Sequence, residues 1–164
     1  VAWSTTTLPA ASVIQGGTMI RKWESDNAGP LLSLWLESTT EAHPFISASY
    51  WKENEGMVRD VYLPAAETWV WEEDGMLRGF ISVMQSQFVG ALFVSTDFIG
   101  QGIGRALLNH VQQRFPYLSL EVYQKNVRAV NFYHAQGFRI EDSAWQDDTQ
   151  HPTWIMSWQA DQTP

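Results

Sequence analysis

The spacing of apolar residues predicts a short strand and then two helices in the first third of the chain. Met19 to Glu24 is expected to form the strand. Apolar residues then recur at i, i+3, i+4, i+7 and i+8, the spacing of one helical face: Ala28, Leu31, Leu32, Trp35 and Leu36. Pro44 interrupts this pattern, and a second helix is expected from Ser47 to Tyr62, stopped by Pro64.

The middle of the chain has the two-residue period of β-strands. Glu67 to Glu72 alternates apolar and polar side chains, and Asp74-Gly75 is a dipeptide that favours a tight hairpin. Further strands are expected from Met76 to Gln85 and from Phe88 to Val94. The region therefore predicts three consecutive strands, of which the first two are joined by a hairpin.

The last third returns to mixed helix and strand signals after a glycine-rich loop, Gly100 to Gly104. A third helix follows, ended by Pro116, with one apolar face: Ile103, Leu107, Val111 and Phe115. A fourth helix is expected from Asn126 to Gln136, capped by Asn126 and closed by Gly137. Three more strands are expected at Leu118 to Val122, Phe138 to Glu141 and Thr153 to Trp158. The order β-α-α-β-β-β-α-β-α-β-β predicts one mixed α/β domain.

Length and charge distribution set the boundaries of that domain. The chain has 164 residues, enough for one domain with a sizeable core. Residues 1–18 carry no charge and contain Gly16-Gly17, so we expect a disordered leader or tag-like segment there. The domain is expected to span residues 19–164, with a native start at Met19.

Composition narrows the possible chemistry. The chain has no cysteine, which excludes disulfides, thiolate metal sites and a cysteine nucleophile, and its four histidines lack metal-ligand spacing, so no metal is expected. The net charge of −8 disfavours nucleic acid as a partner. It suits a cationic amine substrate, or it serves only solubility. No apolar run approaches the ~20 residues of a membrane span.

The first motif with chemical meaning is FIGQGIGRALL, from Phe98 to Leu108. Closely spaced glycines lead directly from a strand into an amphipathic helix. Free N–H groups at a helix start, together with the helix dipole, favour an anion such as a diphosphate. The motif matches neither a P-loop nor a dinucleotide fingerprint. A glycine turn that only packs tightly is the alternative.

The second motif is LEVYQKNVRAVNFYHAQGF, from Leu120 to Phe138. Asn126, Val130 and Tyr133 recur at i, i+4 and i+7, so Asn126 and Tyr133 share one helical face. A buried tyrosine requires a partner for its hydroxyl. Taken alone, Tyr133 is expected to be a core residue whose hydroxyl is bonded to a carbonyl.

Together the two motifs resemble the GNAT superfamily of acyl-CoA N-acyltransferases. Gly102 and Gly104 match its diphosphate-binding loop, although Ile99 stands where Gln or Arg is usual. A second match is N-x-x-A-x-x-F-Y-x-x-x-G-F, at Asn126, Ala129, Phe132, Tyr133, Gly137 and Phe138. Segments such as LWLESTTEAHPFI, WVWEEDG and PTWIMSW further resemble the YiaC-type lysine acetyltransferases of enteric bacteria. The resemblance implies a twisted mixed sheet of about seven strands with about four helices, and a cytoplasmic enzyme.

This resemblance also implies site residues. Acetyl-CoA is expected to bind the loop and two neighbouring elements, at Leu92, Phe93, Val94, Gly100, Gln101, Gly102, Ile103, Gly104, Arg105, Asn126 and Phe132. A backbone N–H of Phe93 or Val94 would polarise the thioester carbonyl. Tyr133 would meet the leaving thiolate. Glu121 would act as the base, because E-x4-N-x6-Y also occurs in the ribosomal-protein alanine acetyltransferases.

The acceptor side is predicted from residue type alone. His43, Phe45, Tyr50, Trp51, Trp69 and Phe88 are candidates to line an acceptor groove, although each of them is also a typical core residue. His43 beside Pro44 is either a proton relay or a capping and packing residue. The expected acceptor is a protein or peptide amine, above all a lysine ε-amino group attacking directly in a ternary complex. A small-molecule amine, or a non-catalytic acetyl-CoA-binding regulator, is the alternative, and the oligomeric state stays open.

Overall fold

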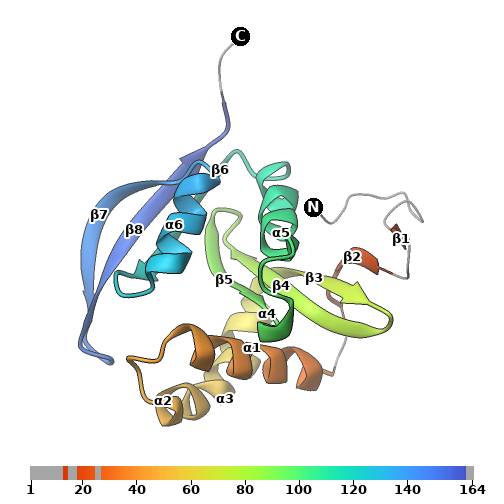
Figure 1. The fold of residues 1–164 in the computed structure, drawn as a ribbon, viewed down its shortest axis with the longest axis horizontal. Helices are drawn as coiled ribbons and strands as arrows, with labels where there is room; N and C mark the ends of the chain where they lie inside the picture. The colour runs from red at the N-terminus through yellow and green to blue at the C-terminus, as the bar shows by residue number, and fades with distance from the viewer. Residues whose placement is uncertain (1–12, 15–17, 25–26, 162–164) are drawn as a thin grey trace.

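Eight strands form one mixed sheet in the computed structural model, which describes residues 13–14, 18–24 and 27–161 (Figure 1). The strand order is β1-β2-β3-β4-β5-β6-β8-β7, and neighbours are antiparallel except for β5 and β6, which are parallel. The strands are β1 (Val13–Ile14), β2 (Thr18–Lys22), β3 (Ala66–Glu73), β4 (Met76–Met84), β5 (Phe88–Val94), β6 (Tyr117–Tyr123), β7 (Arg139–Gln146) and β8 (His151–Gln159).

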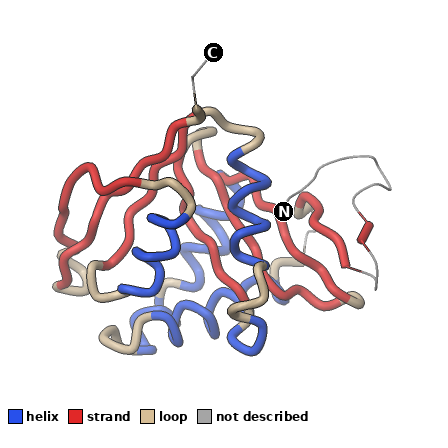
Figure 2. Tube along the Cα trace, turned by 45° about the horizontal axis from the view of Figure 1, so that its top comes forward, coloured by secondary structure: helices blue, strands red, loops and turns tan. Residues whose placement is uncertain are grey.

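Helices cover both faces of this sheet. On one face lies α1 (Gly29–Ala42) with a chain of short helices: α2 (Ala48–Glu53), α3 (Glu55–Met57), the π-helical turn η3 (Val58–Tyr62) and α4 (Leu63–Ala65). The 3₁₀ turn η4 (Thr96–Phe98) leads from β5 towards α5 (Ile103–Gln112), and α6 (Val127–Ala135) follows β6. Figures 1 and 2 show α5 and α6 together on the face opposite α1.

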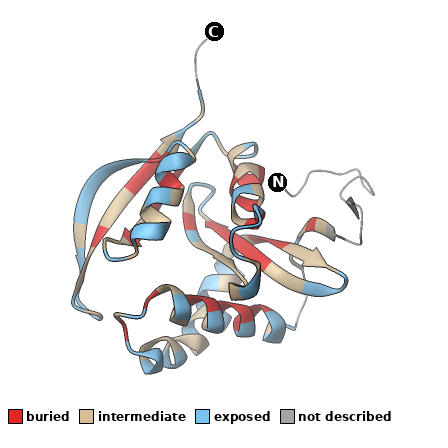
Figure 3. Cartoon of the chain, in the orientation of Figure 1, coloured by how far each residue is buried: buried red, intermediate tan, exposed pale blue. Residues whose placement is uncertain are grey.

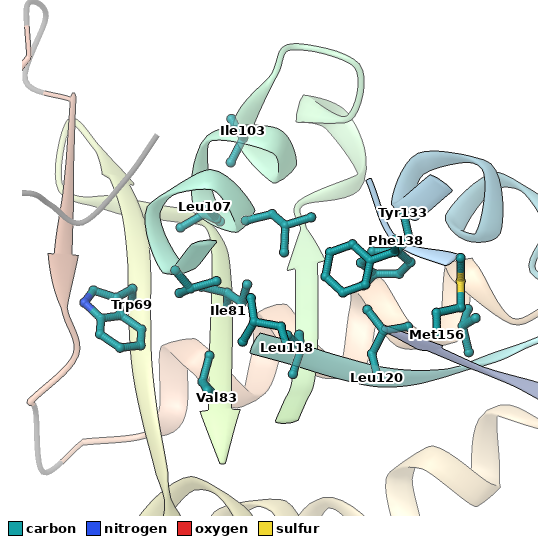
Figure 4. Packing of buried hydrophobic residues seen from close by; sticks show 14 of the residues in the cluster. Trp69, Ile81, Val83, Ile103, Leu107, Leu118, Leu120, Tyr133, Phe138 and Met156 are labelled. Atoms are coloured by element: carbon teal, nitrogen blue, oxygen red, sulfur yellow. The ribbon is translucent and has the colours of Figure 1, made fainter. Parts of the chain in front are cut away.

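Strand alternation divides the apolar side chains between two cores. Val70 and Phe80 are buried against Leu31 and Trp35 of α1. Their chain neighbours Trp69 and Ile81 point to the other face, where they join the larger cluster under α5 and α6, because successive strand residues face opposite sides (Figure 4). Buried positions therefore follow the strands and the inner faces of α1 and α5 (Figure 3).

The predicted strand pattern is confirmed. All seven predicted strands are present, and β5 has the predicted bounds. Asp74 and Gly75 both have positive φ, 52° and 81°, as a tight hairpin turn requires. The two final strands are longer than predicted, because the added residues of β7 are mainly polar and exposed and show no apolar alternation. Strand β1 pairs with Thr18 and Met19, so the sheet reaches into the predicted leader, whose other residues lie outside the described ones.

Two helix ends differ from the prediction. The helical stretch that begins at Ala48 runs past Pro64 to Ala65, and Pro64 lies in the first turn of α4. Proline is tolerated there because the first N–H groups of a helix have no partner within it. Helix α5 ends at Gln112, before Pro116, although Phe115 still donates its N–H to the carbonyl of Val111.

Candidate active site

The sheet opens between β5 and β6. These parallel strands pair at one position, Phe88 with Ser119, where the N–H of Ser119 donates to the carbonyl of Gln87 at 2.8 Å. The pairing of β4 with β5 shifts by one residue there, which leaves Gly90 as an extra residue in β5. Such a bulge bends its strand. The bend accounts for the separation of β5 from β6 beyond Phe88.

A cleft of ≈ 1190 Å³ occupies this opening. It brings together nearly all the predicted site residues: Leu92, Phe93 and Val94 of β5, Gly100 to Arg105, Glu121, Asn126, Phe132, Tyr133, His43 and Phe88. Tyr50 and Trp51 also line it. Two predictions were wrong. Phe45 does not line the cleft but packs behind it, and Trp69 is buried in the core beneath α5.

The glycine loop has the geometry of an exposed backbone cradle. Gly100 and Gly102 have φ values of 90° and 87°, a region that other residues rarely adopt. A methyl group on either would meet no atom within 4 Å. Gly102 is the N-cap of α5, and no side chain caps that helix start. The first N–H groups of α5 therefore lie beside open space in the cleft, as anion binding requires.

The charged side chains that line the cleft are mainly basic, whereas the chain as a whole is acidic. Arg105 and Arg128 line it, against one carboxylate, Glu121, although the chain carries a net charge of −8. Both arginines are exposed at the starts of α5 and α6. The sequence analysis missed Arg128, which its position two residues after the capping Asn126 could have indicated. Two guanidinium groups near a helix start favour a phosphate-bearing ligand.

Tyr133 lies at the inner wall of the cleft. Its ring packs between those of Phe132 and Phe138, at centroid distances of 5.3 and 5.6 Å. Among the described residues none forms a hydrogen bond with its hydroxyl, so the expected carbonyl partner is not found. Burial raises the pKa of Tyr133 well above its usual range. The phenol therefore keeps its proton and can donate a hydrogen bond.

Glu121 is held in the cleft by two neutral donors. Its Oε2 accepts hydrogen bonds from Oγ1 of Thr153 at 2.6 Å and from Nε2 of Gln146 at 2.7 Å. Thr153 and Gln146 come from β8 and β7, and the sequence analysis identified neither of them. Both bonds reach one oxygen, which fixes the carboxylate and leaves Oε1 for another partner.

An aromatic cluster around His43 forms another part of the cleft wall. The ring of His43 lies 5.1 Å from that of Trp51, 5.3 Å from Tyr123 and 5.7 Å from Phe45. His43 is 7% exposed and follows α1 as its C-cap, so it packs at the helix end while it also lines the cleft. Burial lowers the pKa of His43, and the hydrogen bond to Thr39 opposes that effect.

No group of three or more His, Asp and Glu side chains among the described residues could hold a metal ion. No helix in the described part of the chain is long and apolar enough to cross a membrane.

Comparison with known proteins assigns the family. The family model described as "Acetyltransferase (GNAT) domain" matches residues 35–151. YiaC from Escherichia coli (strain K12), named a peptidyl-lysine N-acetyltransferase, is 57% identical over 145 residues, which cover 88% of this chain and 99% of YiaC. The chain belongs to the GNAT family of N-acetyltransferases.

Solved structures agree with this assignment. The solution structure of apo YjaB from Escherichia coli superposes with a TM-score of 0.74 at 30% identity, covering 88% of this chain and 99% of that one. The PaiA N-acetyltransferase from Thermoplasma acidophilum, solved in complex with coenzyme A, has a TM-score of 0.71 at 19% identity, covering 87% and 98%. At that identity PaiA supports the fold alone.

Proposed function

We propose that this N-acetyltransferase moves an acetyl group from acetyl-CoA to the ε-amino group of protein lysines, by direct attack in a ternary complex. One observation carries the proposal: a single cleft holds an exposed helix start, a protonated buried tyrosine and a fixed carboxylate. The lysine acceptor is supported by YiaC, whose name specifies peptidyl-lysine. The cytoplasmic location implied by the resemblance belongs to the same proposal.

Acetyl-CoA would bind along the loop and β5. The N–H groups at the start of α5 would bind the diphosphate, and Arg105 and Arg128 would supply the cationic contacts that Ile99 lacks. The pantetheine arm would lie along the edge of β5 that β6 leaves unpaired beyond Phe88. A backbone N–H of Phe93 or Val94 would then polarise the thioester carbonyl. Membership of the GNAT family of N-acetyltransferases supports this type of ligand.

Glu121 would remove a proton from the acceptor. An alkylammonium group has a pKa of about 10.4 and no lone pair for attack, so it must lose a proton first. Oε2 of Glu121 is occupied by Thr153 and Gln146, whereas Oε1 can face the amine directly or through a water molecule. The amine nitrogen then attacks the thioester carbon, and the C–S bond breaks as the tetrahedral intermediate collapses.

Tyr133 would stabilise the departing thiolate. Because burial keeps its hydroxyl protonated, the phenol can donate a hydrogen bond to the sulfur as negative charge develops there. Its unpartnered hydroxyl in the described structure is consistent with a donor that waits for a ligand. The thiolate finally takes up the proton that the nitrogen loses on becoming an amide, and leaves as coenzyme A.

A mass-spectrometric assay with three acceptors tests the proposal. Purified protein and acetyl-CoA are incubated with a lysine peptide, a peptide with only an N-terminal amine, or spermidine, with Tyr133→Phe alongside. We expect transfer to the lysine side chain that falls strongly in the variant. Transfer to spermidine or to the α-amine alone would contradict the lysine assignment, while coenzyme A binding without any transfer would contradict catalysis.

A further inference from the structure

The buried imidazole of His43 is a polar group in the cleft that the mechanism above does not use. Its Nδ1 lies 2.7 Å from the carbonyl oxygen of Thr39 and 3.2 Å from the Thr39 hydroxyl. A carbonyl oxygen can only accept, so Nδ1 carries the proton and donates it. The other ring nitrogen, Nε2, is then an unprotonated acceptor, and no described residue bonds to it.

The surroundings keep this tautomer neutral and fixed. Trp51, Phe45 and Tyr123 surround the ring, and burial disfavours its charged form. The bond to Thr39 is local, four residues back in α1, so it orients the ring without help from the sheet. A fixed, neutral acceptor in an aromatic setting suits an amine donor better than it suits an anion.

His43 and Glu121 both line the cleft, and Tyr123 lies between them in contact and sequence. Tyr123 is two residues after Glu121 in β6, so both side chains project from the same face of that strand. The ring of His43 is 5.3 Å from the ring of Tyr123, and His43, Tyr123 and Glu121 all line the cleft. An acceptor amine bound beside Glu121 would therefore share the cleft with this imidazole.

We propose that Nε2 of His43 accepts a hydrogen bond from the acceptor amine and so orients its lone pair towards the thioester carbon. This role rests on the proposed acetyl transfer and adds a second acceptor beside Glu121, which remains the base. Once Glu121 has taken one proton, the neutral amine keeps two N–H bonds and one lone pair, and an N–H bonded to Nε2 of His43 then restricts the direction in which the lone pair can point. His43 transfers no proton in this arrangement.

Two substitutions separate this role from a structural one. In His43→Asn, the side-chain amide can replace Nδ1 and keep the bond to Thr39, but nothing stands at the Nε2 position. The longer amide in His43→Gln brings an acceptor oxygen near the Nε2 position instead. If His43 positions the amine, His43→Gln should preserve activity better than His43→Asn. If its role is limited to the hydrogen bond with the Thr39 carbonyl, His43→Asn should preserve activity better.

The kinetic experiment uses whichever of the three amines the wild-type protein acetylates, so it does not depend on the lysine assignment. For His43→Asn we expect kcat/KM for the amine to fall about 10- to 100-fold, with the Kd of acetyl-CoA unchanged. For His43→Gln we expect a loss of about fivefold or less. The exposed His134, changed in the same two ways, is the matched control. Equal losses in both variants, or a greater loss with Gln, would overturn the proposal.

A measurement on the wild-type protein covers the case in which either variant folds poorly. Long-range ¹H–¹⁵N spectra report the state of each imidazole nitrogen, so His43 can be followed while amine is added to the protein with coenzyme A. We expect the Nε2 resonance to shift as it accepts a hydrogen bond, while Nδ1 stays protonated. If the Nε2 resonance does not shift when the amine is added, the proposed hydrogen bond is refuted.

Discussion

The two halves of the cleft are built in different ways. The donor half consists of the glycine loop with α5 and the start of α6, two short segments separated by one strand. The acceptor half collects His43 after α1, Trp51 from α2, Glu121 and Tyr123 from β6, and two residues of the β7–β8 hairpin that hold Glu121. The donor half needs few residues, because it is a local backbone shape that fits acetyl-CoA. The acceptor half depends on how elements distant in the chain pack together. The donor half should therefore respond to backbone changes and the acceptor half to side-chain changes.

Loss of the Tyr133 hydroxyl should have the largest effect. Tyr133→Phe keeps the ring contacts with Phe132 and Phe138 and removes only the donor to the thiolate. We expect kcat to fall about 10²–10³-fold, with the Kd of acetyl-CoA within about twofold of wild type. Steady-state kinetics and calorimetry measure the two quantities, with the exposed Tyr117→Phe as control. If acetyl-CoA binding weakens as much as kcat falls, Tyr133 serves only to bind the acetyl donor.

Neutralising Glu121 should come next. Glu121→Gln keeps an oxygen that can accept from Thr153, yet it cannot take a proton at neutral pH. We expect kcat/KM for the amine to fall about 10²-fold at pH 7 and to recover as the pH approaches the amine pKa of about 10.4, because the amine then loses its proton to solvent. A pH–rate profile measures this, and Glu37→Gln on the exposed side of α1 makes the same charge change. A loss that is constant with pH would contradict a base.

A backbone change in the glycine loop should act on the donor half alone. Gly102→Ala forces a side chain into a left-handed conformation that costs about 1–2 kcal/mol, so the loop should relax and misdirect its N–H groups. We expect the Kd of acetyl-CoA to rise about tenfold, with KM for the amine unchanged. Gly75→Ala is the matched control, because Gly75 also has positive φ and free space around it but lies in the β3–β4 turn. If both variants bind acetyl-CoA normally, the loop does not hold the diphosphate.

Acid should produce the smallest effect, shared by both halves. Burial lowers the pKa of His43 in the acceptor wall, and burial together with Arg114 lowers the pKa of His110 in α5 still further. Both are neutral when folded, whereas the unfolded chain takes up their protons below about pH 6.5. The stability that they contribute is therefore present above that pH and lost below it.

Urea unfolding at pH 7 and pH 5 measures this loss. We expect the free energy of unfolding to fall at pH 5, by up to about 2 kcal/mol for His110 and by less for His43, whose pKa is lowered less. In His43→Asn, the part of this fall in the free energy of unfolding that is due to His43 should disappear, and the part due to His110 should remain. An unfolding midpoint that does not change with pH, or a fall that persists in full in the variant, would contradict the assignment.

Local sequence patterns were enough to predict most of the fold and the glycine loop of the donor half. Strand alternation placed most of the strands because these strands bury one or both faces, and the period of two does not depend on the details of packing. Gly102 and Asn126 were predictable for a similar reason: a left-handed N-cap and a side-chain cap are local backbone requirements. Where the local signal was weak, as in the polar edge strand β7, the predicted bounds were too short.

The composition of the acceptor half depends on the packing of distant segments, which no local pattern predicts. Phe45 and Trp69 have the residue types of a groove, yet one packs behind the cleft and the other lies in the core, because an aromatic side chain suits either environment. Gln146 and Thr153 carry no motif, and they matter because β7 and β8 place them beside Glu121. Contacts between segments so far apart in the chain leave no periodic trace in the sequence, so packing alone brings them together.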